Sequence, residues 1–420
     1  MHPQALLELA TELIHRVLQL QHPADGVVSD FFRQHRALGS RERHTLAETT
    51  YAVLRERLLF QHLAQSGKGE MERRLAVLAW QGNEGFLRAA LSETEQQWLA
   101  QVKQIDRAAL PEKLRHNLPE WLATTLRAEL GEDEFWPLIE ALNAPAGLDL
   151  RVNAFKAKRD AVQAELKANG IDAQPTPYSP LGLRIDGKPA LHKLEVYTRG
   201  DVEVQDEGSQ LLALLLGAKR GEMVADFCAG AGGKTLALGA EMRNTGRLYA
   251  FDTSGHRLAA LKPRLARSGL SNVYPIQIAH ERDERVKRLA RKLDRVLVDA
   301  PCSGLGTLRR NPDLKWRQTP QAIEELRAKQ AAILASAARL VKPGGRLVYA
   351  TCSLLRAENE EIAAAFSAEH EREFVPLDAI EALQAAHVAE ADGLVRDGCL
   401  RLWPHRHATD GFFAALWQRR

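Results

Sequence analysis

Apolar residues recur at helical spacing through the first third of the chain. Two runs show this spacing, with Leu6, Leu9, Ala10, Leu13, Ile14, Val17 and Leu18 in the first and Leu46, Thr50, Val53, Leu54 and Leu58 in the second. Ser92 and Glu95, which precede Trp98, have the spacing of a capping box at the start of a further helix. The pattern therefore predicts an all-helical domain over residues 1–142.

The pattern changes after a break at residues 143–147, where the sequence reads Asn-Ala-Pro-Ala-Gly. Strand-like and helical stretches follow, with strands at 150–152, 182–185 and 202–204 and a helix at 160–169. These elements predict a small α+β module over residues 148–205.

Strand-like and helix-like stretches alternate from residue 206 to near the C-terminus. Strands are predicted at 223–227, 247–251, 273–278, 295–299 and 346–350, and helices at 233–242, 254–267, 282–292 and 320–341. Such alternation is typical of a parallel sheet with helices on both faces, here in a domain over residues 206–420. Two final apolar runs, 393–402 and 411–417, have no helical pattern between them and predict an antiparallel hairpin at the sheet edge.

Length and composition fit a globular protein of two or three domains. The chain has 420 residues, of which 45% are hydrophobic and 26% charged, so the collagenous, low-complexity and wholly disordered classes are excluded. Its apolar runs fall well short of the ~20 residues of a membrane span. Glu8 and Glu12 interrupt the N-terminal run where a signal peptide would be apolar. We therefore expect a cytoplasmic protein without a membrane partner.

Cysteine usage argues against a structural role in cross-linking or metal binding. The cysteines, Cys228, Cys302, Cys352 and Cys399, lie far apart without a Cys-x-x-Cys pair, and the histidines are not clustered. We expect neither a disulfide framework nor a bound metal.

Charge is unevenly distributed along the chain. The whole chain has 57 Lys and Arg residues and 54 Asp and Glu residues. Residues 1–150 contain 16 basic and 21 acidic residues, whereas residues 251–350 contain 20 basic and 9 acidic residues. A basic block of this kind indicates a polyanionic partner such as a nucleic acid. The alternative is a solvated face that only keeps the protein soluble.

A glycine-rich loop follows the first predicted strand of the 206–420 domain. It runs from Asp226 to Thr235 (Asp-Phe-Cys-Ala-Gly-Ala-Gly-Gly-Lys-Thr) and opens into a helix, so backbone N–H groups there can receive an anion. A Walker A loop would need glycine where Cys228 stands. Asp252 ends the second strand, where related sheets hydrogen-bond a ribose. Together these residues favour an adenosine-containing cofactor; the alternative is a tight structural turn.

Two cysteines follow strands of the same predicted sheet. Asp299-Ala-Pro-Cys302 comes after one strand and Thr351-Cys352-Ser353 after another. Ligands bind beyond the carboxyl ends of such strands, so both thiols are expected to face one crevice. A single cysteine of this kind is more often a buried packing residue, but a pair beside a glycine loop favours a functional site.

At these motifs the sequence resembles the RsmB/Nop/NSUN family of RNA 5-methylcytosine methyltransferases. Four further blocks resemble the family: Leu150-Arg-Val-Asn153, Gln205-Asp-Glu-Gly-Ser209, Arg309-Arg-Asn-Pro-Asp-Leu-Lys-Trp316 and Pro404-His-Arg-His-Ala-Thr-Asp-Gly-Phe-Phe413. Ser40-Arg-Glu-Arg43 and Tyr51-Ala-Val-Leu-Arg55 are similar to the NusB-like domain of the bacterial RsmB enzymes. The resemblance implies an all-helical NusB-like domain, a small α+β RNA-binding module and a class I Rossmann-like methyltransferase domain, an α/β fold.

The resemblance also implies a reaction. It implies S-adenosyl-L-methionine-dependent methylation of cytosine C5 in RNA, most of all in small-subunit ribosomal RNA, with Cys352 adding to C6 and Cys302 assisting breakdown of the adduct. Asp299 would hold the cytosine edge or the amino-acid end of the cofactor, and Lys234 would lower the pKa of the thiolate. From the residues alone the roles of the two cysteines stay open, because the nucleophile of DNA cytosine methyltransferases lies in a Pro-Cys motif, which would indicate Cys302.

Cofactor and RNA contacts are implied in the same way. The cofactor would contact Cys228, Ala229, Gly230, Ala231, Gly232, Gly233, Lys234, Asp252, His280 and Asp299; at His280 many relatives carry Asp, and at Gly230-Ala231 they carry Ala-Pro. RNA phosphates would lie on Arg309, Arg310, Lys315 and Arg317, with Trp316 either stacked on a base or packed in its loop. The same chemistry on transfer RNA, an inactive RNA-binding assembly factor and, more distantly, a nicotinamide oxidoreductase are the alternatives. A monomer is expected.

Overall fold

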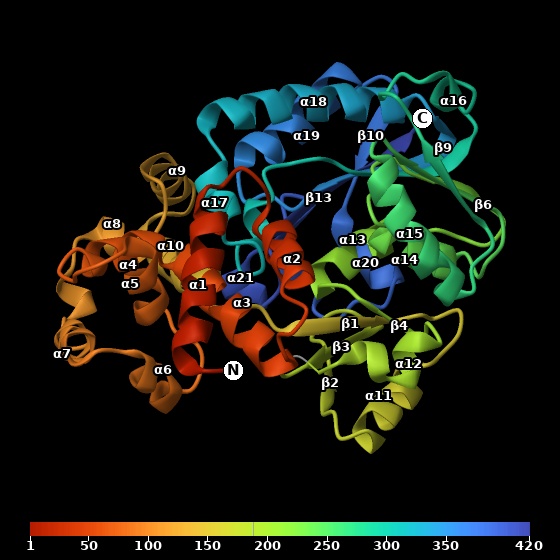
Figure 1. Ribbon diagram of the computed structural model, residues 1–420. Helices are drawn as coiled ribbons and strands as arrows, with labels where there is room; N and C mark the ends of the chain where they lie inside the picture. Colours follow the sequence, from red (N-terminus) through yellow and green to blue (C-terminus); the bar gives the residue numbers. More distant parts are fainter. Residues whose placement is uncertain (188) are drawn as a thin grey trace. The chain divides into compact units, whose positions relative to one another are not determined.

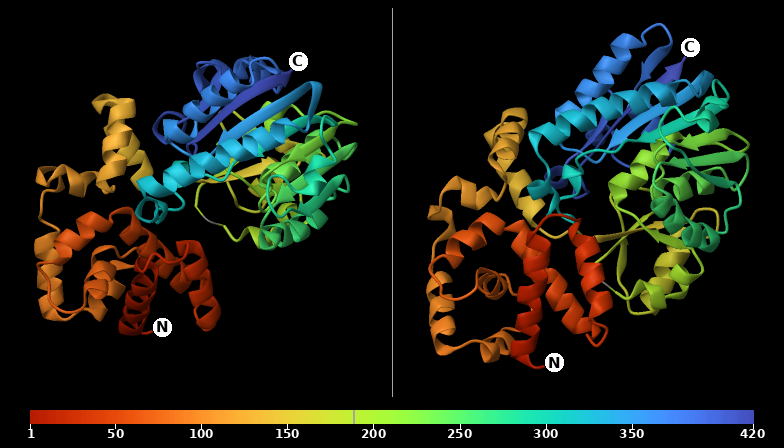
Figure 2. Two further views of the ribbon diagram at one scale, coloured as in Figure 1. Left: turned by 90° about the horizontal axis from the view of Figure 1, so that it is seen from above. Right: turned by 45° about the horizontal axis from the view of Figure 1, so that its top comes forward.

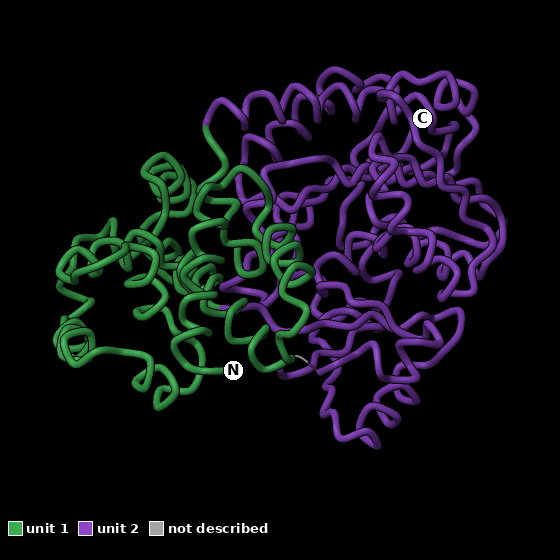
Figure 3. The backbone as a smooth tube through the Cα atoms, viewed as in Figure 1, with its two compact units in different colours: residues 1–144, 308–319 green, residues 145–307, 320–420 purple. Residues whose placement is uncertain are grey.

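The computed structural model describes residues 1–187 and 189–420. Within these residues the chain divides into two compact units (Figure 3). The first comprises Met1–Ala144 with Leu308–Thr319, and the second comprises Pro145–Thr307 with Pro320–Arg420. None of the helices in the described residues is long and apolar enough to cross a membrane.

The first unit is helical, as predicted. Its helices are α1 (Pro3–Leu18), α2 (Ala24–Gln34), α3 (Ser40–Arg55), α4 (Arg57–Ala64), α5 (Met71–Leu78), α6 (Glu84–Ala90), α7 (Glu93–Val102), η1 (Arg107–Ala109), α8 (Glu112–His116), α9 (Glu120–Leu130), α10 (Glu132–Asn143) and α17 (Leu314–Arg317). The predicted capping box starts α7: Ser92 Oγ accepts from the backbone N–H of Glu95 at 3.3 Å, and Glu95 Oε2 accepts from that of Ser92 at 2.9 Å. Apolar faces of α1 to α7 form the core.

A small antiparallel sheet opens the second unit, with strand order β2-β3-β1-β4. Its elements are β1 (Leu148–Val152), α11 (Arg159–Ala168), β2 (Ala173–Pro175), β3 (Gly182–Ile185), η2 (Leu191–Lys193), α12 (Glu195–Thr198) and β4 (Val202–Val204). The sequence pattern missed β2, because two of its three residues are exposed and the strand shows no apolar alternation.

The main sheet has the strand order β11-β12-β13-β9-β8-β5-β6-β7, and β10 pairs with β13. Its strands are β5 (Met223–Asp226), β6 (Arg247–Asp252), β7 (Val273–Gln277), β8 (Leu293–Asp299), β9 (Val341–Thr351), β10 (Phe374–Leu377), β11 (Val395–Arg396), β12 (Cys399–Leu402) and β13 (Phe412–Arg419). Pairs from β7 through β9 are parallel, and those made by β13 are antiparallel. The predicted parallel sheet with an antiparallel edge is confirmed.

Helices cover both faces of this sheet (Figures 1 and 2). They are α13 (Glu207–Leu216), α14 (Gly233–Glu241), α15 (Gly255–Ser268), α16 (Glu284–Lys287), η3 (Leu305–Thr307), α18 (Pro320–Ala338), η4 (Arg356–Glu358), α19 (Glu360–Glu369), α20 (Ala379–Ala385), η5 (Ala391–Leu394) and α21 (Pro404–His407). Alternate strand residues point to opposite faces: Val224 and Val348 pack with α13, α14, α15 and α20, whereas Ala225 and Leu347 pack with α18 and α19.

Two predicted details are wrong. The helix expected over 282–292 is restricted to α16, because Asp283 caps its start and the backbone is left-handed at Arg291, with φ of 58°. A short helix, α21, lies between the two final strands where none was expected. It begins with Pro404, whose fixed φ and missing N–H suit a first helical turn.

Candidate active site

A cavity of about 1040 Å³ lies beyond the carboxyl ends of the central parallel strands. The loops after β5, β6, β7, β8 and β9 supply most of its lining: Cys228, Ala229, Gly230, Ala231, Gly233, Lys234, Asp252, His280, Asp299, Cys302 and Cys352 border it, among others. The fold thus brings together almost all of the predicted site residues. The exception is Gly232, which turns the loop without lining the cavity.

The glycine-rich loop owes its shape to two left-handed residues, Gly230 (φ 56°) and Gly232 (φ 84°). A Cβ atom on Gly232 would lie 2.1 Å from Leu261 Cδ1, and the left-handed backbone there disfavours any residue with a Cβ atom. At Gly230 there is nothing within 4 Å of such an atom among the described residues. The loop therefore presents backbone and open space to the cavity, and α14 starts directly after it.

Asp252, at the end of β6, is hydrogen-bonded to the glycine-rich loop. Its Oδ2 accepts from the backbone N–H of Gly230 at 2.8 Å, and its Oδ1 accepts from that of Ser254 at 2.7 Å. Each carboxylate oxygen has a second lone pair, so the side chain can still accept bonds from a ligand in the cavity.

Two arginines connect the glycine loop to the small sheet, Arg151 from β1 and Arg264 from α15. Arg151 Nη1 in β1 donates to the carbonyl of Gly233 at 2.7 Å. Arg264 Nη1 donates to the carbonyl of Ala231 at 2.7 Å, and its Nε donates to Glu203 of β4 at 3.0 Å. Sequence reasoning missed these supporting residues, since the bonds depend on how the small sheet packs.

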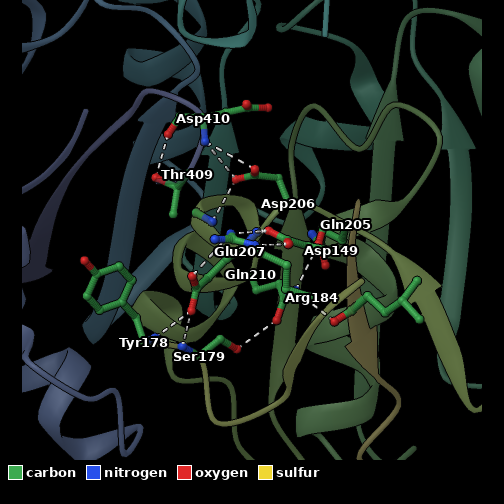
Figure 4. Close-up of polar contacts among 12 residues, drawn as sticks. Asp149, Tyr178, Ser179, Arg184, Gln205, Asp206, Glu207, Gln210, Thr409 and Asp410 are labelled. Carbon is green, nitrogen blue, oxygen red and sulfur yellow. Dashed lines mark hydrogen bonds and ion pairs between the residues drawn. The ribbon is translucent and has the colours of Figure 1, made fainter. Parts of the chain in front are cut away.

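A buried polar network joins the small sheet to the start of α13 (Figure 4). Glu207 accepts from the backbone N–H groups of Tyr178 and Ser179 at 2.6 and 2.7 Å. Asp149 accepts from the N–H of Glu207 at 3.1 Å and forms a two-point pair with Arg184. Burial raises the pKa of Glu207, with the surrounding hydrogen bonds acting in the opposite direction. The small sheet is thereby fixed to the domain that holds the cavity.

The two strand-end cysteines meet. Cys302 follows β8 and Cys352 follows β9, and their sulfur atoms are 3.4 Å apart. The backbone N–H of Gly306 donates to the carbonyl of Cys352 at 2.8 Å, which ties the two loops together directly. The contact with Cys352 and burial raise the pKa of Cys302 well above its ordinary value. Cys302 is thus held as a thiol that can donate to its neighbour.

Lys234 lies beside this pair. Its Nζ is 2.7 Å from Asp299 Oδ2, and its side chain is 10% exposed. Burial acts to lower the pKa of Lys234, but the charges of Asp299 and Cys352 outweigh it and the pKa is raised. The positive charge of Lys234 is therefore paired with Asp299 and close enough to interact electrostatically with Cys352.

Two further predicted cofactor residues, Cys228 and His280, also border the cavity. Cys228 lines the cavity, and burial together with nearby aspartates raises the pKa of its thiol. His280 is exposed at the rim, where its Nδ1 accepts from the backbone N–H of Arg282 at 3.1 Å.

The expectation that Lys315 binds RNA phosphate is wrong. Lys315 is 2% exposed, and its Nζ donates to the carbonyl of Arg55 at 2.7 Å and to Asn143 Oδ1 at 3.1 Å. Burial lowers its pKa to about 7. Trp316 packs within the helical unit and donates from Nε1 to the carbonyl of Leu54 at 2.7 Å. Sequence spacing could not separate cations that anchor the loop from cations that face solvent.

The parallel sheet, the glycine loop after β5, the carboxylate that ends β6 and the cavity beyond them define a Rossmann-like methyltransferase domain. Residues 213–418 match the family model of the 16S rRNA methyltransferases RsmB/F, and residues 118–192 match the ferredoxin-like domain of RsmF/B-like methyltransferases.

Similar proteins agree with these matches. The chain is 37% identical over 302 residues to the probable ribosomal RNA small subunit methyltransferase B of Synechocystis sp., covering 72% of this chain and 66% of that protein, just under two thirds. It is 35% identical over 336 residues to the ribosomal RNA small subunit methyltransferase B of Sodalis glossinidius, covering 79% and 71%. The crystal structure of PH0851 superposes with a TM-score of 0.80 at 26% identity, covering 100% and 99%. The chain belongs to the RsmB/F family of S-adenosylmethionine-dependent methyltransferases.

Proposed function

We propose that this protein methylates C5 of a cytosine in small-subunit ribosomal RNA. The observation that carries the proposal is the pair of thiols, Cys302 and Cys352, 3.4 Å apart beside a cofactor-sized cavity. C5 of cytosine is a weak nucleophile, and addition of a thiolate to C6 converts it into an enamine-like carbon that can attack an electrophilic methyl group. The similarity to ribosomal RNA small subunit methyltransferases supports this class of substrate.

The cavity fits S-adenosylmethionine, which supplies the electrophilic methyl group when bound. The loop Cys228–Lys234 and the start of α14 would hold its amino-acid end, together with Asp299. Asp252 would accept from the ribose hydroxyls with its free lone pairs, and His280, which is exposed and lines the cavity, would contact the adenine. The open space at Gly230 supports this fit.

The chain's own groups divide the remaining work. Cys352 is the nucleophile in this proposal, because the charge of Lys234 interacts with it and Cys302 can donate to its sulfur. A nearby cation and a hydrogen-bond donor both favour attack by a thiolate. After methyl transfer the C5 proton passes to a base, the role that Cys302 would take once its own proton has been released to solvent. The electron pair of that C–H bond re-forms the C5–C6 double bond, the C6–sulfur bond breaks and Cys352 returns as a thiolate. Cys302 assists this second stage. The target base has to leave its stack to reach both thiols.

Two experiments test the proposal. Bisulfite sequencing of ribosomal and transfer RNA from a deletion strain should show one small-subunit cytosine that loses its methyl group, restored by the wild-type gene and not by Cys352→Ala. Loss of a methyl group in transfer RNA alone would overturn the choice of substrate, and no loss in either would favour the inactive assembly factor. A ribosomal substrate would also place the protein in the cytoplasm.

The cysteine roles need a separate measurement. Purified Cys302→Ala should accumulate an RNA adduct that survives denaturing electrophoresis, and the Cys302→Ala, Cys352→Ala double variant should not. Cofactor binding to Cys352→Ala, measured by titration, should be close to that of the wild type because the glycine loop is untouched. An adduct that forms in Cys352→Ala and not in Cys302→Ala would reverse the two roles.

A further inference from the structure

The residue after each cysteine is a buried serine, and both serines bind the same carboxylate. Ser303 Oγ donates to Glu358 Oε2 at 2.5 Å, and Ser353 Oγ donates to the same oxygen. The backbone N–H of Ser303 donates to Glu358 Oε1 at 2.8 Å. Glu358 therefore connects the loop that carries Cys302 to the loop that carries Cys352.

This carboxylate is fully enclosed. Glu358 and Ser353 are 0% exposed and Ser303 is 1% exposed. Gln330 of α18, also 0% exposed, donates from Nε2 to Glu358 Oε1 at 3.0 Å and to the carbonyl of Pro301 at 3.0 Å. A buried carboxylate with several donors is costly to remove, because every donor is then left unpaired.

The segment that carries Glu358 is itself fixed. The hydroxyl of Tyr349, in β9, donates to the carbonyl of Glu358 at 2.7 Å. The next residue, Asn359, donates from Nδ2 to the carbonyl of Ser353 at 3.0 Å and accepts from the hydroxyl of Thr351. Glu358 thus has a defined position relative to the strand that ends at the Cys352 loop.

We propose that Glu358 is a positioning residue that holds the two thiols at reacting distance from each other and from the cavity. The idea that Glu358 presents both thiols to one cytosine ring rests on the proposed function. The effect of Glu358 on the distance between the thiols does not. The side chain acts on the cysteines through the serines and does not line the cavity, so it touches neither substrate nor cofactor in this arrangement.

The thiol spacing can be measured without RNA. Diamide accepts the two electrons and two protons that Cys302 and Cys352 release when their sulfurs bond, and mass spectrometry identifies the linked peptides. Wild-type protein should close this disulfide readily, whereas Glu358→Gln should close it about tenfold more slowly or worse. The amide NH2 group has to face either the two serine hydroxyls or the Ser303 N–H and Gln330 Nε2, and both sets donate to the carboxylate in the wild type. Equal rates in the two proteins would overturn the proposal, and so would a wild-type protein that forms no Cys302–Cys352 link.

Kinetics separate positioning from general stability. Glu358→Gln should lower kcat by about tenfold or more while KM for S-adenosylmethionine stays within about twofold. The matched control is Glu222→Gln: Glu222 pairs with Arg295 at 2.7 Å and immediately precedes β5, at the end of the sheet away from the cavity. It should lose stability without a change in disulfide closure or kcat. Parallel losses of both in the control would overturn the positioning role.

Single serine variants keep the test decisive if Glu358→Gln does not fold. Ser303→Ala and Ser353→Ala each free one loop from the carboxylate, and each should slow disulfide closure. Normal closure in both would overturn the proposal. If Glu358→Gln slows closure but the wild type methylates no cytosine, the proposed function fails and the positioning role of Glu358 stands.

Discussion

At the scale of single residues, burial sets the protonation of the groups around the cavity. Asp226, at the end of β5, is 1% exposed, and burial raises its pKa to about 7, against the hydrogen bond from Thr235 at 2.7 Å. Its Oδ1 has no hydrogen-bond partner among the described residues. Asp226 therefore gains a proton more readily in the folded chain than in the unfolded one.

This shift predicts a pH-dependent stability. The folded pKa of about 7 lies above the ordinary value of 3.8, so the stability that Asp226 contributes is complete below the ordinary value and is lost as the pH rises through about 7. Asp226→Asn should flatten this loss, with a slope smaller by up to about 1.4 kcal/mol per pH unit. Urea unfolding of both proteins from about pH 5 to about pH 8 measures it.

The control for this experiment is Asp397→Asn, because the Asp397 side chain is 94% exposed. This variant should follow the wild-type curve. Parallel curves for Asp226→Asn and the wild type would mean that Asp226 is already ionised in the folded protein at low pH.

At the scale of elements, the strands and helices with a regular apolar repeat could be predicted from the sequence. The strands β5 to β9 and the helices α14, α15 and α18 lie close to their predicted positions, because their buried faces repeat at strand or helix spacing. The paired cysteines and Asp299 were found because they end adjacent strands. Glu358 and Arg151 were not, because their roles arise only when distant segments close on one another. The role of Lys315 was mispredicted for the same reason, whereas the helix expected over 282–292 is wrong for local reasons, the cap at Asp283 and the left-handed backbone at Arg291.

Lys315 belongs to a packing element and has a testable role. It donates to acceptors at the C-terminal ends of α3 and α10, which favour a positive charge. Lys315→Met should lower the free energy of unfolding by about 1–3 kcal/mol. It should leave the salt dependence of RNA binding unchanged, since the ammonium group is buried. Denaturant unfolding measures the loss of stability, and filter binding over a salt series measures the salt dependence. A reduced salt slope would mean that Lys315 contacts RNA phosphate after all.

Arg317, in the same short helix, is the comparison for that variant. Its side chain is 27% exposed and pairs with Asp313 at 3.4 Å. Arg317→Gln should cost less stability than Lys315→Met, because the Arg317 side chain reaches solvent, whereas buried Asp313 still accepts from the backbone N–H of Ala24 at 3.2 Å.

The segment after β7 carries exposed cations at the rim of the cavity. A surface hollow of about 440 Å³ is lined by four cations, His280 and two acidic residues: Arg282, Arg285, Lys287 and Arg288, with Asp283 and Glu284. We expect this hollow to bind RNA phosphates. The double variant Arg282→Gln, Arg288→Gln should weaken binding to RNAs of different sequence and reduce the slope of log affinity against log salt by about 0.7 for each lost contact.

Lys219→Gln, Arg220→Gln provides the control, since it removes two exposed cations just before β5, at the other end of the sheet. An equal change of slope in both double variants would mean that only overall charge matters.

At the scale of the whole molecule, the two units share one chain in an interleaved order. Residues 308–319 follow the Cys302 loop in sequence, yet they pack in the helical unit through Lys315 and Trp316. The sequence of the methyltransferase domain is thus interrupted by a segment that belongs to the helical unit. The helical unit therefore consists of two segments of the chain, and the second lies within the sequence of the methyltransferase domain.

This order predicts how truncations behave. Deletion of residues 1–144 removes the helices that pack on Trp316 and accept from Lys315. Residues 308–319 then lose their packing partners and expose apolar surface and an unpaired amine. The truncated protein should aggregate and unfold at a lower temperature than the full chain. A second truncation, in which residues 308–319 are also replaced by a Gly-Ser linker of equal length, should stay soluble and bind S-adenosylmethionine within about twofold of the full chain, since every residue that lines the cavity is retained. Size-exclusion chromatography, thermal unfolding and calorimetric titration compare the three proteins. If the simple truncation behaves as well as the one with the linker, the packing of residues 308–319 makes no difference to the rest of the molecule.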